Sequence, residues 1–523
     1  MSPGHEPVLA APHPSALDAA ARAAGRGGNA VDAALAAAAA LTVVYPHQCS
    51  LGGDLIALVH TPDGTVRAML SVGAAAQHVD VPALRAADTR MPAQGPQTVT
   101  VPGVVAGWAA LAAAFGTPGA LPAALRDAAD LARQGATVSA GLARAVRANA
   151  RRIAADPGLS ALLSGSDGRA VEEGDALLQP RLATVLDELA DDPASFYQGA
   201  VAGTLAVGLR RLGSPLTAAD LAAHRARWAE PLTVEAAGMR WWAAPPPSQG
   251  TVLPALLTAA AAADLTEPER TRLLTARCQD ASAARDRLLG DPCGQLLDMQ
   301  GLLDPAPLAG ALPPKPSFRP SGDTVAVTAV DPSGLAVSLI QSVYQTFGSG
   351  LCEPDTGIVL HNRGSAFSLV AGHPGELRPG VRPPHTLCPV IGRSDVLLLA
   401  AGCQGGRAQP QILAQTLPAL AAPDADPVDV LGRPRWVLGA RDIGFEEQTL
   451  LAEPVSVPAS TPSVSPGVPV VVAEAPTDLA GHLQVVRLAR DGRLDAASDP
   501  RADGGVLHRA PATPRTTVEG TTV

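Results

Sequence analysis

The apolar positions follow helical spacing along most of the chain before residue 300, and they form short β-branched runs after residue 323. Thr217, with Asp220 three positions later, has the pattern of an N-cap at the start of one such helix. Three consecutive prolines predict a non-helical loop over 241–250. The pattern predicts helices over 30–41, 107–115, most of 119–215, 216–224, 252–289 and 411–421.

A proline-rich segment separates the long helical part from the β-branched runs. Residues 301–322 contain six prolines, which predicts an extended and exposed linker. Directly after it, 324–330 and 335–344 predict two strands joined by a type I turn over Asp331–Gly334. Neither strand alternates cleanly, so we expect a hairpin that is buried on both faces. The pattern also predicts strands over 55–60, 357–361 and 396–401, a loop over 453–469, and frayed residues at the C-terminal end.

Length, charge and cysteine usage restrict the class of protein. A chain of 523 residues suggests two domains or one large interleaved α/β core. A net charge of −10, with no Lys/Arg block longer than a pair, argues against a nucleic-acid partner. The six cysteines form no CxxC pair and no zinc spacing, which indicates buried, reduced thiols and no metal site.

The N-terminal region predicts neither export nor membrane insertion. It lacks a basic segment followed by an apolar one, which is the pattern of a signal peptide. The apolar stretch 30–44 is shorter than the roughly 20 residues that span a bilayer. We therefore expect a cytoplasmic protein with no membrane contact.

Thr324 is the candidate nucleophile, because it opens a strand immediately after the linker. This layout is typical of hydrolases in which cleavage frees a threonine, whose α-amine, with a pKa of about 7.7–8.0, then acts as general base. The alternative is that threonine merely favours a strand. If the hairpin turn has two central residues, Thr324 faces Gln341 and lies beside Ser342, whose hydroxyl would bond either to Thr324 or to the backbone.

The segment 322–350 resembles the processing junction of the γ-glutamyltranspeptidase family. The resemblance extends over nearly the whole chain, because other blocks similar to family motifs follow in order. These blocks are 27–36, 46–53, 101–107, 174–182, 196–199, 216–221, 245–250, 356–367, 382–389, 405–406 and 498–504.

The resemblance implies the fold and the core of the mechanism. The fold class it implies is α+β, a four-layer αββα sandwich of the N-terminal nucleophile hydrolase type, with helical elaboration in the N-terminal half. Cleavage between Asp323 and Thr324 would give a helix-rich segment 1–323 and a segment 324–523 that form one interleaved unit. By match, Thr324 is the nucleophile, Ser342 takes the place of a supporting threonine, and Gly405 and Gly406 hold the oxyanion. No metal or cofactor is implied.

The sequence departs from the transpeptidase pattern at the substrate end. The stretch 70–77 lacks the arginine that binds the γ-glutamyl carboxylate, and Ala366 replaces the aspartate that binds the α-amine. These losses remove strong charge-assisted hydrogen bonds. The pattern instead resembles a subgroup that includes amidohydrolases of small acyl amides such as oxamate. The candidate substrate-binding residues are Tyr344, Asn362, Arg363, His385 and Thr386. The alternatives are a structural salt bridge for Arg363, which could otherwise bind a carboxylate, and a structural role for His385.

Three functions follow from these observations. We favour a self-processing amide hydrolase or acyltransferase that takes a small amide, with water or an amine as acceptor, and works as a heterodimer of its own two fragments. A further dimer of that heterodimer is left open. The second function is true glutathione hydrolysis or γ-glutamyl transfer. The third, from another class, is an unprocessed ligand-binding pseudoenzyme.

Overall fold

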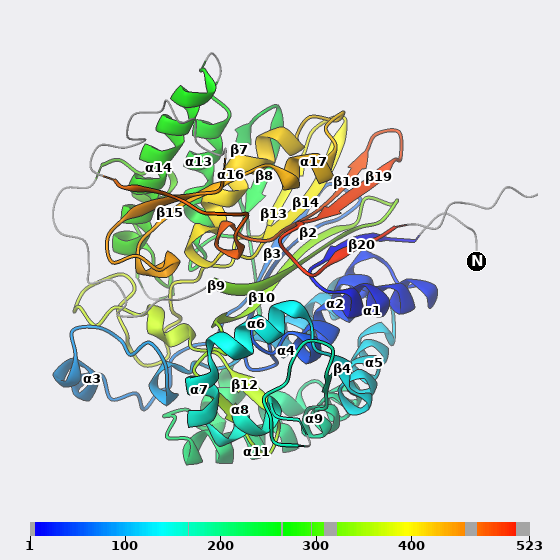
Figure 1. Ribbon diagram of the computed structural model, residues 1–523, viewed down its shortest axis with the longest axis vertical. Coiled ribbons are helices and arrows are strands. Elements are labelled where there is room, and N and C mark those ends of the chain that lie inside the picture. Colours follow the sequence, from blue (N-terminus) through cyan, green and yellow to red (C-terminus); the bar gives the residue numbers. More distant parts are fainter. Residues whose placement is uncertain are drawn as a thin grey trace, which may run out of the picture.

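The computed structural model describes residues 6–165, 167–262, 265–293, 295–307, 322–454 and 468–508. Two antiparallel sheets pack face to face at its centre (Figure 1). The larger sheet has the order β20 (Gly505–Leu507), β1 (Val8–Ala11), β9 (Gly322–Val330), β10 (Ala336–Gln345), β2 (Asp54–His60), β3 (Val66–Ser71) and β6 (Arg227–Ala229). The smaller sheet has the order β19 (Leu494–Ser498), β18 (Leu483–Ala489), β14 (Leu397–Cys403), β13 (Val390–Arg393), β8 (Met239–Ala243) and β7 (Leu232–Ala236).

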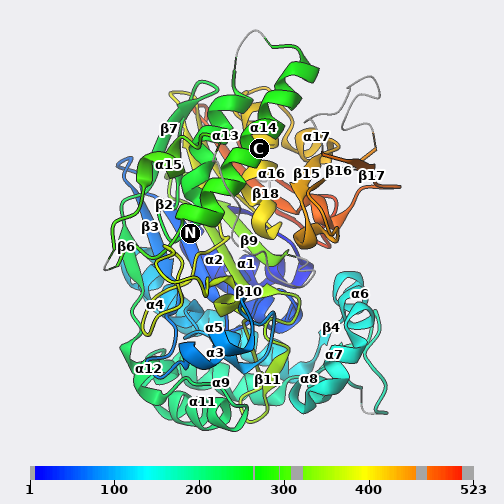
Figure 2. The same ribbon diagram turned by 90° about the vertical axis from the view of Figure 1, so that its left-hand side faces the viewer.

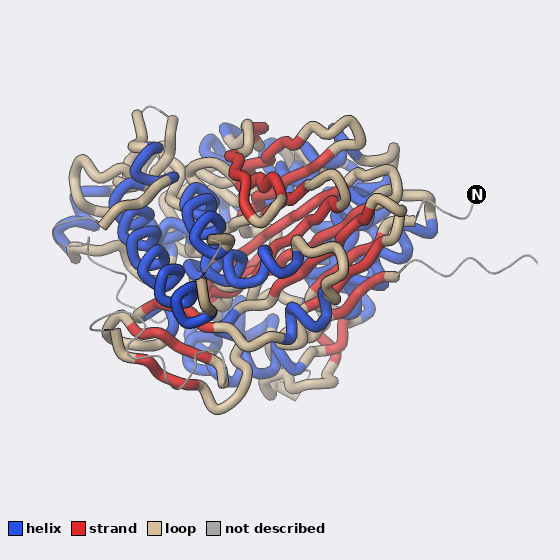
Figure 3. Tube along the Cα trace, turned by 90° about the horizontal axis from the view of Figure 1, so that it is seen from above, coloured by secondary structure: helices blue, strands red, loops and turns tan. Residues whose placement is uncertain are grey.

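Helices cover the outer face of each sheet, so the layers are helix, sheet, sheet and helix, as expected (Figure 3). The larger sheet packs against α1 (Pro14–Gly25), α2 (Ala30–Val44), α4 (Val104–Phe115), α5 (Ala120–Gln134) and α9 (Pro180–Asp191). The smaller sheet packs against α13 (Leu253–Ala260) and α16 (Gln409–Leu420), with α14 (Glu267–Leu288) outside them. Helix α2 is buried along its whole length, and a capping box between Asn29 and Asp32 begins it.

Alternate side chains of the central strands enter two different cores. Leu9 of β1 faces the helices, whereas its neighbour Val8 faces the smaller sheet and packs in one cluster with Ile391 and Val486. Both faces of the strand are therefore apolar, which explains why these strands show no alternation in the sequence. Strands from before and after residue 323 are mixed in both sheets, so neither part could form a closed core alone.

The helical elaboration lies at one end of the molecule, at the bottom of Figure 2. It contains α6 (Ala140–Ala148), α7 (Ala150–Ala155), α8 (Pro157–Leu162), α10 (Ser195–Gln198), α11 (Ala200–Arg211), α12 (Ala218–Ala223) and the pairs β4 (Ala136–Thr137) with β5 (Ala176–Leu177) and β11 (Leu351–Glu353) with β12 (Ile358–Leu360). The predicted capping box of Thr217 and Asp220 begins α12. The remaining elements are α3 (Val81–Ala87), α15 (Met299–Leu303), α17 (Pro427–Gly432) and a sheet of β15 (Trp436–Gly439), β16 (Thr449–Ala452) and β17 (Val470–Val472).

The hairpin register differs from the predicted one by one residue. The type I turn is present, since the N–H of Gly334 donates to the carbonyl oxygen of Asp331 at 3.0 Å. Gly334, however, has φ +88°, so the loop has three residues and Asp331 pairs with Leu335. Gln341 consequently lies opposite Val325, not opposite Thr324.

Three further predictions need correction. The helix predicted over 252–289 is interrupted, because Thr266 and Glu269 form a capping box that starts a new helix, α14. The loop predicted over 241–250 begins inside strand β8, whose residues pair with β13. Residues 301–303 belong to α15 rather than to a linker. Residues 304–307 lie in no helix or strand, as predicted, and Gly322 belongs to β9. Residues 308–321 of the linker, most of the predicted 453–469 loop and the C-terminal end lie outside the described residues.

Within the described residues, no helix is both long and apolar enough to span a bilayer. The cysteines are free, and five of them are buried as expected, whereas Cys293 is exposed.

Candidate active site

Thr324 and Ser342 meet at a bulge in the central hairpin. The pairing shifts between Gln341 and Tyr344, so that Tyr344 lies opposite Asp323 and Thr324 lies beside Ser342. The hydroxyl of Thr324 donates to the hydroxyl oxygen of Ser342 at 3.0 Å, and that oxygen also accepts from the N–H of Tyr344 at 2.7 Å. Both hydroxyl residues are buried. The bulge therefore holds two hydroxyl groups in contact next to the Asp323–Thr324 peptide bond.

The bulge also gives Tyr344 an unusual backbone conformation. Its φ is +78°, a region that non-glycine residues rarely adopt and that costs on the order of 1–3 kcal/mol. The conformation places the ring under Arg363, whose Cζ atom lies 3.3 Å from the ring centroid. Such strain persists only where surrounding contacts hold it, and here the N–H bond to Ser342 does so.

The double glycine forms the turn between β14 and α16. Gly405 has φ +147° and Gly406 has φ +52°, and a Cβ atom on Gly405 would lie 2.6 Å from Cδ1 of Ile412. The carbonyl oxygen of Gly406 accepts from Nε2 of Gln249 at 2.8 Å, which fixes the turn. Cα atoms of the following turn, Gly406–Ala408, lie within 8 Å of strand β9. Backbone N–H groups are thus available close to the strand that carries Thr324.

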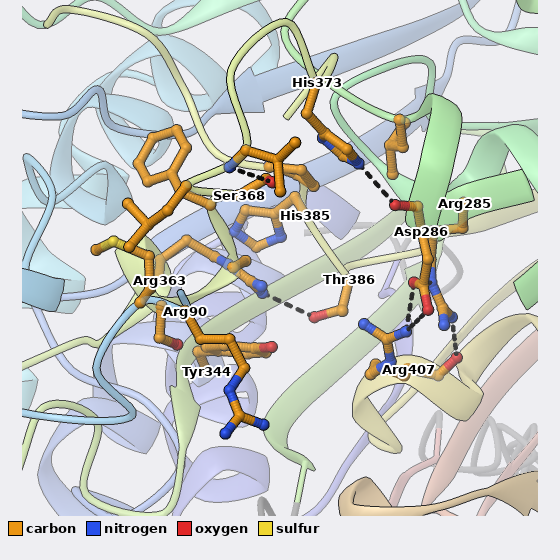
Figure 4. A pocket seen from close by; sticks show the side chains of 18 of the residues that line it. Arg90, Arg285, Asp286, Tyr344, Arg363, Ser368, His373, His385, Thr386 and Arg407 are labelled. Carbon is orange, nitrogen blue, oxygen red and sulfur yellow. Dashed lines mark hydrogen bonds and ion pairs between the residues drawn. The ribbon is translucent and has the colours of Figure 1, made fainter. Parts of the chain in front are cut away.

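A cavity of about 100 Å³ opens at the end of β10, where Tyr344 lines it, whereas Thr324, Ser342, Gly405 and Gly406 are not among its lining residues. Four of the five predicted substrate-binding residues line it, namely Tyr344, Arg363, His385 and Thr386. Figure 4 shows Arg363 over Tyr344 with its guanidinium bonded to Thr386. Asn362 is not in the lining, and its Nδ2 donates to the carbonyl oxygen of Ala93 at 2.8 Å.

Arg363 carries a charge that no nearby carboxylate compensates within 4 Å in the described part of the chain. Its side chain is buried, its Nη1 donates to the Thr386 hydroxyl at 3.1 Å, and its Nε has no hydrogen-bond partner among the described residues. Burial lowers the pKa of Arg363 from its ordinary value, because enclosing a cation costs free energy. An anion that entered the cavity would compensate this charge.

Several residues around the cavity were not predicted from the sequence. Arg407, directly after the double glycine, pairs with Asp286 at 2.5 Å, and Arg285 contacts the same carboxylate at 3.1 Å. Arg285 also donates to the side chain of Gln249 at 3.2 Å. This network joins the cavity wall to the double-glycine turn, and of its members only Gln249 belonged to a block with family resemblance.

Asp54 and two histidines lie behind the cavity. Nε2 of His385 is 3.3 Å from Oδ2 of Asp54, and Nδ1 of His361 is 3.5 Å from the same oxygen. Burial lowers the pKa of His385 well below its ordinary value, so His385 is neutral. No group of three or more His, Cys, Asp or Glu residues in the described ranges is arranged to hold a metal ion.

Two apposed sheets between helical layers, with a buried hydroxyl residue on an inner strand, define an N-terminal nucleophile hydrolase fold. The crystal structure of cephalosporin acylase from Bacillus halodurans superimposes with a TM-score of 0.84 at 28% identity, over 96% of each chain. The gamma-glutamyltranspeptidase family model matches residues 16–508, and the chain belongs to this family.

Two curated relatives cover nearly the whole chain. The oxamate amidohydrolase proenzyme of Klebsiella pneumoniae is 38% identical over 516 residues, which are 95% of this chain and 97% of the relative. The glutathione hydrolase-like YwrD proenzyme of Bacillus subtilis is 32% identical over 524 residues, covering 96% and 98%. The chain is thus an enzyme of the γ-glutamyltranspeptidase family, related to amide hydrolases and acylases.

Proposed function

We propose that the chain cleaves itself between Asp323 and Thr324 and then hydrolyses a small amide that carries a carboxylate. The contact of 3.0 Å between the hydroxyl groups of Thr324 and Ser342, next to the bond to be cut, supports the self-cleavage. The Thr324 oxygen attacks the carbonyl carbon of Asp323, the C–N bond breaks, and an ester forms. Water then hydrolyses the ester, which leaves the carboxylate of Asp323 and a free amine on Thr324.

The freed threonine has the parts needed for amide hydrolysis. Its amine takes the hydroxyl proton while the oxygen attacks the amide carbon of the substrate. The N–H groups of Gly405 and Gly406 stabilise the resulting oxyanion, a role in which one donor is commonly worth about 2.7–4 kcal/mol. The C–N bond of the substrate breaks, ammonia leaves with the proton, and water hydrolyses the acyl ester on Thr324.

The single observation that carries the substrate proposal is the buried, uncompensated guanidinium of Arg363 in the cavity wall. A substrate carboxylate in the cavity would pair with the guanidinium, with Tyr344 and Thr386 holding the guanidinium plane in place. The cavity of about 100 Å³ suits a small acyl group, since a cavity of about 150 Å³ accommodates benzene. Oxamate, which the Klebsiella relative is named for, has both an amide and a carboxylate within this size.

Glutathione hydrolysis or γ-glutamyl transfer remains the second candidate, because the Bacillus subtilis relative is named glutathione hydrolase-like. The cavity offers fewer binding groups to a γ-glutamyl substrate, because Ala366 lines it at the position where transpeptidases have an aspartate that binds the α-amine. Comparing the hydrolysis of oxamate with that of a γ-glutamyl anilide distinguishes the two. A faster reaction with the anilide would refute the preferred substrate class.

A denaturing gel tests the self-cleavage and the pseudoenzyme alternative. We expect two fragments from the wild-type chain, and an intact, inactive chain from Thr324→Ala. Thr217→Ala, which removes a hydroxyl at a helix start far from the hairpin in sequence, is the control that should still cleave. Normal cleavage of the Thr324→Ala chain would show that the nucleophile lies elsewhere, and an uncut wild-type chain without activity would favour a pseudoenzyme.

A further inference from the structure

The hydrogen-bond partners of Asp54 and of the two histidines beside it restrict which of their atoms carry protons. Asp54 is fully buried at the start of β2, where its backbone pairs with that of Ser342. Its Oδ1 accepts from the N–H of Gly73 at 3.1 Å, and its Oδ2 faces both His361 and His385. The state of each imidazole follows from its other hydrogen-bond partners.

His385 donates to Asp54. The backbone N–H of Leu387 points at Nδ1 of His385 at 3.3 Å, and an N–H can only donate, so Nδ1 holds a lone pair. A neutral imidazole then carries its proton on Nε2, which lies 3.3 Å from Oδ2 of Asp54. The ring therefore lines the cavity with both nitrogens in hydrogen bonds, so it cannot accept a proton from the substrate.

His361 has the opposite arrangement. Its Nε2 lies 2.9 Å from the carbonyl oxygen of Thr100, which can only accept, and 3.0 Å from the hydroxyl oxygen of the same residue, which can accept as well. The carbonyl contact places the proton on Nε2. Its Nδ1 then carries a lone pair, has no hydrogen-bond partner in the part of the chain that the structure describes, and faces Oδ2 of Asp54 at 3.5 Å. Burial lowers the pKa of His361 to about 4, so a second proton on the ring is excluded at neutral pH. A carboxylate oxygen and a bare imidazole nitrogen repel each other unless a proton lies between them.

We propose that Asp54 is a positioning residue that stays protonated in the working enzyme, so that Arg363 keeps its full charge for the carboxylate of the substrate. The proton of Asp54 lies toward Nδ1 of His361. Burial also raises the pKa of Asp54 to about 8, in agreement with this assignment. The inference rests on the proposed function, because it requires an anionic substrate at Arg363.

An ionised Asp54 would change the selectivity of the cavity. Arg363 interacts electrostatically with Asp54, and an internal carboxylate would offset the positive charge that attracts a substrate anion. The charged or titratable groups that face Asp54 from the surrounding elements are His361, His385, Arg363 and Tyr197, with His224 behind them on Ser71. The two histidines are neutral, so among these groups ionisation of Asp54 is the change expected between pH 7 and pH 9.5. The α-amine of the freed Thr324, with an ordinary pKa of about 7.7–8.0, titrates in the same range, but it does so in the wild type and in D54N alike.

The pH dependence of KM tests the proposal with oxamate as the probe. For the wild-type enzyme we expect KM to rise about tenfold between pH 7 and pH 9.5, while kcat does not fall in parallel. The variant D54N cannot ionise at this position, so its KM should stay within about twofold over the same range. D395N, which removes an exposed aspartate, should reproduce the wild-type profile. A flat wild-type KM, or a D54N profile that rises like that of the wild type, would overturn the proposal.

A second measurement needs neither activity nor a variant. Carboxyl-carbon NMR of the wild-type protein labelled at aspartate should show one carboxyl group that titrates near pH 8, and titration of every aspartate below pH 6 would refute a protonated Asp54. If the wild type fails to hydrolyse oxamate, the proposed substrate is wrong, and this titration still decides the state of Asp54.

Discussion

Replacing Arg363 with methionine tests the link between the buried guanidinium and the substrate carboxylate. Methionine keeps much of the length and volume of the side chain but removes the charge, the bond of 3.1 Å to Thr386 and the donor Nε. Because no carboxylate of the described residues lies within 4 Å of the Arg363 guanidinium, the substitution leaves none of them without a directly paired counter-ion. The fold should therefore tolerate R363M, and the thermal midpoint should stay close to that of the wild type.

The expected loss of activity follows from the bonds that a substrate carboxylate would make. A hydrogen bond to a charged group is worth about 1.5–3 kcal/mol, which corresponds to a loss of roughly tenfold to 150-fold in kcat/KM for oxamate. Most of the loss should be in KM, since Arg363 binds the part of the substrate that does not react. Oxamide, which has a second amide in place of the carboxylate, should lose less than about threefold.

The assay is ammonia release from oxamate and from oxamide by wild type, R363M and R240M. Arg240 is an exposed arginine that pairs with Glu235 on the surface, so R240M controls for the loss of one positive charge. An equal loss of kcat/KM for both substrates in R363M would refute the reasoning, because a group that binds only the carboxylate cannot affect the diamide. An unchanged KM for oxamate would refute it as well.

Two further predictions concern the double glycine and the buried charges of the second segment. In G405A the new Cβ atom would lie 2.6 Å from Cδ1 of Ile412 at φ +147°, so kcat should fall by about 100-fold or more, measured by steady-state kinetics. The control is G492A, where φ is +85° and no atom lies within 4 Å; an equal loss there would contradict a specific role for the double glycine. In R501M, Glu453 and Asp499 stay buried without this partner, so the free energy of unfolding should fall by about 3–5 kcal/mol in a denaturant titration. Burial raises the pKa of Glu453, but its hydrogen bonds, of which that from Arg501 contributes most, lower it by more, so the folded-state pKa lies below the ordinary value of 4.5. The stability that the pair contributes is therefore present above pH 4.5 and is lost as pH falls through the lowered pKa. If R501M were as sensitive to acid as the wild type, the pairing would be contradicted.

Family motifs and local pattern predicted the layers, the central hairpin and four of the residues that line the cavity. The register was missed, because the αL conformation of Gly334 and the bulge before Tyr344 each change the pairing, and neither is visible in the apolar pattern. The break near Thr266 had a readable signal, since Thr266 and Glu269 have capping-box spacing in the sequence.

The sequence by itself determined which strand carries the hydroxyl group of Thr324 and which glycines can form a close turn, because these depend on local conformation and order along the chain. Only the tertiary structure decided how charge is distributed at the cavity. Asp54, Asp286 and Arg363 are separated by tens to hundreds of residues, and their protonation and pairing depend on burial and on partners that folding brings together. Electrostatic interaction in a protein interior depends on distance and solvent exposure, and neither is encoded in the spacing of residues along the chain.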